Sequence, residues 1–204
     1  MSAINVEAAI GDLIAAGGAL GRMSWFPATS GNLSRRLGDQ SMAITVSGCD
    51  KSVLTQADIV VSGIAEPFHA RASAETGLHA AVYRVRRRVG AVLHGHTVAA
   101  TLVSRAHEKA GALRLRGYEI LKAFEGISTH EAELIVPVLP NSQDISLLAA
   151  QAAEKLAPLD LTHAFLIAGH GAYVWGSDMA AACRHAEALE FLLVCELERL
   201  RSST

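Results

Sequence analysis

The sequence is poor in charge, in cysteine and in long apolar runs. Only 19% of its 204 residues are charged and the net charge is −2, so no general electrostatic attraction to nucleic acid is expected. Its three cysteines, an odd number at wide spacing, make no disulfide framework and no Cys-x-x-Cys pair, which favours the cytoplasm. No apolar run approaches the ~20 residues of a membrane helix. The N-terminus carries Glu7 and Asp12 without a basic leader, so neither a membrane span nor a signal peptide is expected.

Internal repeats, low-complexity segments and long linkers are also missing. Half of the residues are hydrophobic, which is enough to build a sizeable core in a chain of this length. We therefore expect residues 1–204 to form a single domain.

The most informative stretch is an apolar run, residues 91–93, that leads into His94-Gly95-His96. Alternation along a strand places the two histidines on one face, and the glycine between them leaves the backbone uncrowded. Thr97 can then cap a helix, which puts the pair at a strand-to-helix corner. The alternative is two hydrogen-bonded histidines at the end of a strand.

A second buried strand, residues 164–168, also ends in a histidine, His170, between two glycines. Three histidines leave a tetrahedral zinc ion one open position for water or substrate, which is the pattern of a catalytic site. His170 is therefore the candidate third ligand.

Polar turns follow or precede several predicted strands. Thr29-Ser30-Gly31-Asn32 and Ser47-Gly48 offer backbone N–H groups and hydroxyls to an anion, although ordinary turns have the same composition. Lys51 adds a cation to the second turn or is a solvated charge. Ser73 is either the N-cap of the next helix or a phosphate ligand at its N-terminus.

Two glutamates are candidates for proton transfer. Glu75 either complements the dipole of its helix or lies near the metal. Glu119 stands among apolar residues, where desolvation would raise its pKa and suit it to acid/base work; the alternative is a surface acid paired with Lys122. His79 falls inside the helix after Ser73 and is expected to be packed.

Hydrophobic periodicity predicts five helices and several short strands. The expected helices are 6–20, ended by glycines 17, 18 and 21; one from Ser73 through Tyr83; 98–105; 143–156, capped by Asn141-Ser142; and 178–201, capped by Ser177. The expected strands are 33–37 and 42–46 as a hairpin, 59–61, 91–93, 113–115, 135–138 as an edge strand because of Pro137, 164–168 and 173–176.

Together these motifs resemble the class II aldolase family of phospho-sugar enzymes. The resemblance rests on Thr-Ser-Gly-Asn at 29–32, Ser-Gly at 47–48, Ser-Ala-Glu at 73–75, His-Gly-His at 94–96 and Gly-His-Gly at 169–171. It implies a three-layer α/β fold whose central, mainly antiparallel sheet is flanked by helices. It also implies a homotetramer with active sites at the subunit interfaces.

Within the family, residues 117–126, 140–145, 170–176 and 187–192 resemble the dehydratase branch of methionine salvage. This implies the loss of water from 5-methylthioribulose 1-phosphate, with one Zn²⁺ per subunit on His94, His96 and His170. Glu119 would be the acid/base, with Glu75 as the second candidate. The implied phosphate ligands are Thr29, Ser30, Gly31, Asn32, Ser47, Gly48 and Ser73.

The sequence departs from the family pattern in three places. Arg71-Ala72 replaces a usual Lys-Pro, Gly95 replaces a common threonine, and the segment 62–70 is shortened, which puts substrate access in doubt. Rival interpretations are a phospho-sugar aldolase, a pentulose-phosphate epimerase or a non-catalytic interaction module like the adducin head. The arginines at 84–88 are expected to be a solvated helix end.

Overall fold

Eight strands form one sheet, in the order β3-β2-β1-β4-β8-β7-β6-β5, in a computed structural model that describes residues 4–202. Neighbouring strands are antiparallel except for β6 and β7. The mainly antiparallel sheet that the resemblance implies is therefore confirmed. The strands are β1 (Asn32–Arg36), β2 (Ser41–Thr45), β3 (Ile59–Gly63), β4 (Ala91–Gly95), β5 (Ala112–Leu115), β6 (Leu134–Leu139), β7 (Ala164–Ile167) and β8 (Gly171–Gly176).

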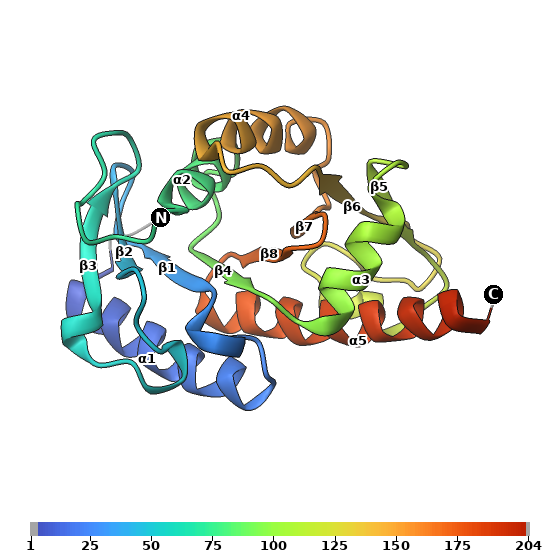
Figure 1. Ribbon diagram of the computed structural model, residues 1–204, viewed down its shortest axis with the longest axis horizontal. Coiled ribbons are helices and arrows are strands. Elements are labelled where there is room, and N and C mark those ends of the chain that lie inside the picture. Colours follow the sequence, from blue (N-terminus) through green and yellow to red (C-terminus); the bar gives the residue numbers. More distant parts are fainter. Residues whose placement is uncertain (1–3, 203–204) are drawn as a thin grey trace.

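Helices cover both faces of this sheet, which gives the predicted three layers (Figure 1). One face is covered by α2 and α4, which pack against each other, and the other by α1, α3 and α5. Each face buries its own hydrophobic cluster, as expected for a sheet covered on both sides. The helices are α1 (Val6–Arg22), α2 (Thr76–Val85), α3 (Val98–His107), α4 (Ile145–Leu156) and α5 (Met179–Ser202).

Strand β4 lies in the middle of the sheet, between β1 and β8, and all five of its residues are buried. The pairing places His94 opposite Asn32 of β1 and opposite Tyr173 of β8. After Gly95 the chain leaves the sheet and enters α3, where the Thr97 hydroxyl accepts a hydrogen bond from the N–H of Ala100. The predicted strand-to-helix corner is confirmed.

Helix α1 continues to Arg22, past the glycines that were expected to end it. A Cβ at Gly17 would lie 2.2 Å from the carbonyl oxygen of Lys51, and one at Gly21 would lie 2.5 Å from Oγ of Ser52. These glycines therefore let the segment 51–53 pack directly against the helix. Tertiary contact outweighs their low helix propensity.

Three helices begin later than predicted. Ser73 does not cap α2, which begins at Thr76; its hydroxyl accepts a hydrogen bond from the N–H of Glu75 at 3.3 Å. In the other two cases a carboxylate is the cap, because it accepts first-turn N–H groups and also complements the helix dipole. The caps of α4 and α5 are Asp144 and Asp178, in place of the predicted Asn141-Ser142 and Ser177.

Pro137 predicts that its strand lies at the edge of the sheet, but β6, which contains it, does not. β6 has β5 on one side and β7 on the other, and β5 is the edge. Pairing with β7 involves only Val138 and Leu139, so the ladder needs no N–H from Pro137.

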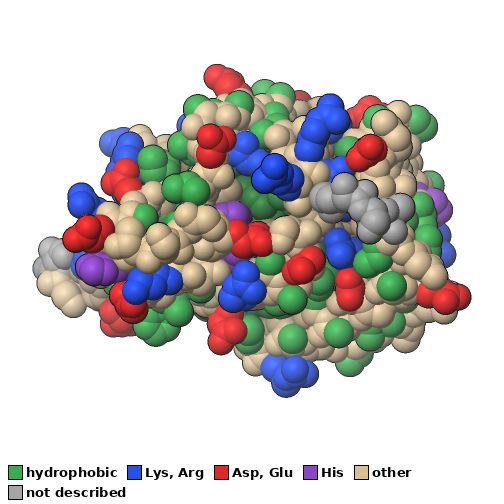
Figure 2. Space-filling model, turned by 180° about the vertical axis from the view of Figure 1, so that it is seen from behind, with side chains coloured by type: hydrophobic (Ala, Val, Ile, Leu, Met, Phe, Trp, Pro, Cys, Tyr) green, Lys and Arg blue, Asp and Glu red, His purple; other side chains and the backbone are tan. Residues whose placement is uncertain are grey.

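Charged side chains of both signs are interspersed on the face shown in Figure 2, without a large basic field. Of the arginines expected to be solvated, Arg86 instead donates to the carbonyl oxygens of Leu156 and Leu159, at 2.6 and 2.5 Å, where α4 ends. Within residues 4–202 we find no helix that combines the length and the apolarity needed to cross a membrane.

Candidate metal centre

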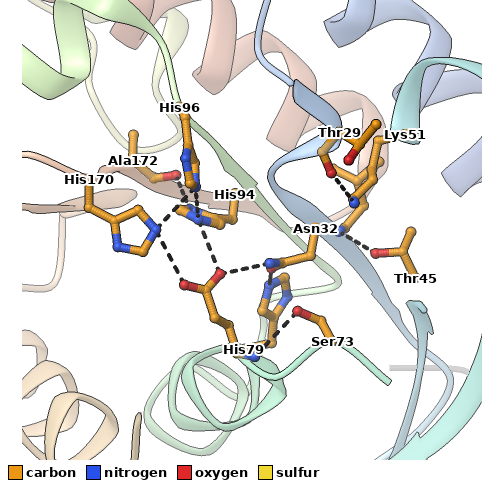
Figure 3. Close-up of polar contacts among 12 residues, drawn as sticks. Thr29, Asn32, Thr45, Lys51, Ser73, His79, His94, His96, His170 and Ala172 are labelled. Carbon is orange, nitrogen blue, oxygen red and sulfur yellow. Dashed lines mark hydrogen bonds and ion pairs between the residues drawn. The ribbon is translucent and has the colours of Figure 1, made fainter. Parts of the chain in front are cut away.

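Three histidine side chains meet where β4 ends and where the chain turns after β7 (Figure 3). His94 and His96 come from the end of β4, and His170 comes from the turn between β7 and β8. The Nε2 atoms of His94 and His96 are 2.8 Å apart, and those of His96 and His170 are 3.1 Å apart. The structure thus brings together the three residues that the sequence nominates as metal ligands.

The donor atoms of this cluster suit a cation. His94 donates its Nδ1 proton to the carbonyl oxygen of Ala172 at 3.0 Å, so its Nε2 presents a lone pair to the other rings. Burial lowers the pKa of His94 to about 3 and that of His96 to about 4, so both rings are neutral at pH 7. A neutral ring whose Nε2 carries a lone pair, as in His94, is the form of histidine that binds a metal ion. Three imidazoles with an open fourth position are a donor set that Zn²⁺ accepts.

Glu75 adds a carboxylate to the centre. Its Oε2 lies 3.2 Å from Nε2 of His94, and its Oε1 lies 3.3 Å from Nε2 of His170. Asn32 donates to Oε2 from Nδ2 at 2.8 Å. Burial acts to raise the pKa of Glu75, but His94, the bond from Asn32 and His170 outweigh it and lower the pKa to about 2. The carboxylate is therefore ionised at neutral pH, beside the histidines.

A chain of buried hydrogen bonds orients Asn32. Its Oδ1 can only accept, so the proton of the 2.5 Å contact belongs to Nε2 of His79. Ser34 donates to Nδ1 of His79 at 2.7 Å, and Tyr83 donates to Ser34 at 2.9 Å. His79 is packed, as predicted, but it also fixes Asn32 and through it Glu75. Because the side chain of Asn32 is used here, its role in phosphate binding stays a prediction.

Gly95, between the two histidines at the end of β4, is required by its neighbour Trp25. A Cβ at Gly95 would lie 2.4 Å from Cε3 of Trp25 and 2.9 Å from its carbonyl oxygen. We expect Gly95→Ala to lower the free energy of unfolding by about 1–3 kcal/mol, the usual effect of overpacking. Gly11→Ala is the control, because a Cβ there meets nothing within 4 Å and should stabilise α1 by up to about 1 kcal/mol. Urea unfolding measures both; equal stability of the two variants would contradict this account.

The two polar turns, residues 28–32 and 47–48, lie where β1 begins and where β2 ends, on strands that pair with each other. In the first, Ala28 and Thr29 have φ of 53° and 61°, a left-handed conformation that is unusual for residues with a Cβ and is concentrated at functional sites. The hydroxyl of Ser30 is buried and has no hydrogen-bond partner in the described part of the chain. A Cβ at Gly31 would lie 2.6 Å from the carbonyl oxygen of His94, so this turn is packed against the histidine strand.

Lys51 joins the two polar turns. Its Nζ donates to the carbonyl oxygens of Thr29 and Cys49, both at 2.6 Å, and the residue is only 2% exposed (Figure 3). The sequence predicts Lys51 either as a cation of the second turn or as a solvated charge. Neither prediction includes a buried lysine that is bonded to carbonyl oxygens. The N–H of Ser73 donates to the carbonyl oxygen of Thr45 at 3.2 Å, and the N–H of Ser47 donates to that of Arg71 at 3.1 Å. The Ser73 segment therefore runs beside the second polar turn, which Lys51 joins to the first.

Glu119 lies on the surface of its own chain, and among residues 4–202 no ion pair or hydrogen bond links it to His94, His96 or His170. Its carboxylate contacts Nζ of Lys122 at 2.5 Å and Nδ1 of His130 at 3.7 Å, and its side chain is 72% exposed. The bond from Lys122 lowers the pKa of Glu119, opposite to the rise predicted by desolvation. It shares a shallow pocket with Ile120 and Phe191, two exposed apolar side chains. Its catalytic role stays a prediction.

A second group of possible ligands, Glu125, His163 and His185, was not predicted from the sequence. His185 donates to the carbonyl oxygen of Trp175 at 2.7 Å and accepts from the N–H of Glu125 at 3.0 Å. The Glu125 carboxylate accepts from the N–H and hydroxyl of Ser177, and His163 donates to the Glu125 carbonyl oxygen at 2.7 Å. Nδ1 of His163 has no partner in the described part of the chain, but the other bonds fasten the Glu125 segment to the end of β8 and to α5.

The His185 interaction predicts a pH dependence of stability. Burial lowers the pKa of His185 to about 4, whereas an unfolded histidine titrates near 6.5. Between these values the unfolded state binds more protons, so stability falls as pH decreases from 6.5 to 4, by up to about 3 kcal/mol from this residue. In His185→Gln, whose amide can donate and accept in the same places, urea unfolding should show a shallower decline. An unchanged decline would exclude His185 as its source.

The fold and the site together define an α/β protein whose mainly antiparallel sheet presents a three-histidine centre at its end. The sequence matches the family described as Class II Aldolase and Adducin N-terminal domain over residues 11–197, and the chain belongs to this family. The family resemblance and the fold inferred from the sequence are therefore confirmed.

Relatives in the dehydratase branch are similar over most of the chain. It is 49% identical over 187 residues to the methylthioribulose-1-phosphate dehydratase of Xanthomonas campestris pv. campestris strain 8004, covering 89% of this chain and 85% of the relative. It is 45% identical over 177 residues to the enzyme of that name from Parvibaculum lavamentivorans, covering 87% of each. Among solved structures, L-fuculose-1-phosphate aldolase from Thermus thermophilus is 27% identical, with a TM-score of 0.74 over 95% of this chain and 96% of that one.

Proposed function

We propose that this chain converts 5-methylthioribulose 1-phosphate into 2,3-diketo-5-methylthiopentyl 1-phosphate and water, as a single catalytic domain in methionine salvage. The observation that carries the proposal is the convergence of the His94, His96 and His170 Nε2 atoms, in a chain 45–49% identical to relatives named for this reaction. The three imidazoles meet with their Nε2 atoms toward one another, an arrangement that suits a metal ligand set and favours an enzyme over a non-catalytic module.

The histidines would hold one Zn²⁺ per subunit, since their three nitrogens leave a fourth position open. Bound there, the ion would act as a Lewis acid that polarises the substrate carbonyl and makes the neighbouring C3 proton more acidic. The bond from His94 Nδ1 to the Ala172 carbonyl oxygen keeps the His94 ring in the tautomer and orientation that a ligand needs.

A carboxylate of this chain must take the C3 proton and later return a proton to the departing C4 hydroxyl. We assign both steps to Glu119, because one carboxyl can perform them if it reaches both atoms. Glu75 is the second candidate, supported by its place beside His94 and His170. Glu119 is exposed in its own chain, so it serves a site that a neighbouring subunit completes.

The phosphate would bind the polar turns, with Thr29, Ser30, Gly31, Asn32, Ser47, Gly48 and Ser73 as ligands. The hydroxyl of Ser30, unpartnered within the described residues, supports this assignment. Such binding anchors the substrate and orients its carbon chain at the histidines.

The active form is proposed to be a cytoplasmic homotetramer with its sites between subunits. Exposed apolar side chains next to Glu119 support an interface there: Ile120 is 37% exposed and Phe191 is 56% exposed. Three free cysteines fit a reducing compartment.

A substrate panel tests the reaction. Zinc-loaded protein is incubated with 5-methylthioribulose 1-phosphate, L-fuculose 1-phosphate and ribulose 5-phosphate, and products are identified by mass spectrometry. We expect water loss from the first and no turnover of the other two. Cleavage of fuculose 1-phosphate or epimerisation of ribulose 5-phosphate, without dehydration, would assign the chain to another activity of the family.

A further inference from the structure

Lys51 carries a buried amino group that no carboxylate in residues 4–202 pairs with. The residue is 2% exposed, and its amino group donates to the carbonyl oxygens of Thr29 and Cys49. The ion pairs of the described chain involve other cations. An ammonium has three donors, so two bonds leave one for another group. The carboxylates of Asp50 and Glu75 act on Lys51 electrostatically, but neither forms an ion pair with its amino group. Since burying a charge without a direct partner is costly, this lysine requires an explanation.

The surroundings of Lys51 point to an anionic ligand. The buried hydroxyl of Ser30 has no partner in the described part of the chain, and it belongs to the turn that Lys51 holds through Thr29. A Cβ at Gly31 would lie 2.6 Å from the carbonyl oxygen of His94, so an anion bound at the first polar turn would be close to the histidine strand. The close packing of Gly17 on the Lys51 carbonyl oxygen fixes the backbone of this residue.

We propose that Lys51 is the counter-charge of the substrate's phosphate dianion, bound between the two polar turns. Its bonds to Thr29 and Cys49 hold the turns together, and its remaining donor contacts a phosphate oxygen. This inference rests on the proposed function in one respect, that the substrate carries a phosphate. A lysine that only clamps the two turns is the alternative, and a neutral donor would then serve equally well.

Lys51→Gln separates the two explanations, because its amide can still donate to carbonyl oxygens but carries no charge. Calorimetry on the zinc-loaded protein measures the binding of inorganic phosphate. We expect Kd to rise about 10- to 100-fold, the scale of a charged hydrogen bond, with zinc content unchanged. Exposed Lys109→Gln, a matched control in the turn that follows α3, should bind phosphate as the wild type does. Unchanged phosphate affinity in folded, zinc-loaded Lys51→Gln would overturn the proposal.

Hydrogen exchange of the wild-type protein covers the case in which Lys51→Gln does not fold. Inorganic phosphate should protect amides in residues 29–32 and 47–51; if it protects neither turn, the subsite is not there and the proposal fails. A failure of the proposed function gives a different result from a failure of this inference. Lys51-dependent phosphate binding without dehydration would leave this inference standing and make the substrate a different phosphate ester. For a phosphorylated substrate, Lys51→Gln should raise KM more than it lowers kcat.

Discussion

His96→Ala is expected to lose bound metal and activity together. Nε2 of His96 lies 2.8 Å from Nε2 of His94 and 3.1 Å from Nε2 of His170. Its removal leaves only two histidine nitrogens for the metal. Metal-ion catalysis supplies several kcal/mol of transition-state stabilisation, so turnover should fall roughly 1000-fold or more. Elemental analysis of the purified variant and the dehydration assay measure the two losses.

The control is His107→Ala, a half-buried histidine whose ring contacts the carbonyl oxygen of Val103 at the end of α3. It should retain one zinc per subunit and full activity. Stoichiometric zinc and normal turnover in His96→Ala would remove this residue from the ligand set.

Glu119→Gln is expected to keep metal and fold while losing at least ~100-fold in turnover, the scale of general acid/base catalysis. The side chain is 72% exposed and contacts Lys122 and His130 at the surface, so the amide should not disturb folding. Glu75→Gln is the comparison. Because Glu75 contacts His94 and His170, its replacement should also weaken metal binding. Near-normal turnover in Glu119→Gln would move the proton-transfer role to Glu75.

Mixed oligomers test whether Glu119 acts across a subunit interface. Glu119→Gln and His96→Ala subunits, each inactive alone, should regain part of the activity when unfolded and refolded together, because some sites then combine an intact histidine set with an intact carboxylate. Mixtures that stay inactive, although size-exclusion chromatography shows mixed oligomers, would contradict a shared site.

The strands that carry the histidines could be predicted because their signals are local. An apolar run that ends in His-Gly-His, and another that ends in Gly-His-Gly, indicate buried strand ends without any knowledge of the rest of the chain. The resemblance to the family then indicates which polar loops accompany these histidine strands. The sheet then places Asn32 and Tyr173 on either side of His94, as neighbours that only strand pairing reveals.

Long-range contacts explain what the sequence could not predict. The glycines of α1 are read locally as helix breakers, but they allow the Lys51 segment to approach the helix. Pro137 is read as an edge residue, but the ladder needs no N–H from it. Asn32 is read as a phosphate ligand, yet its side chain lies between Glu75 and His79, which are distant in sequence. No local pattern encodes such pairs.

The most direct test of a histidine-centred dehydratase is the assay of product formation before and after metal removal. Purified protein is given 5-methylthioribulose 1-phosphate, then stripped with a chelator, and then reloaded with Zn²⁺. We predict diketone formation in the untreated sample, none in the stripped sample and recovery on reloading with one zinc per subunit. Undiminished product formation by fully stripped protein would contradict the metal centre, and no product from zinc-loaded protein would contradict the substrate.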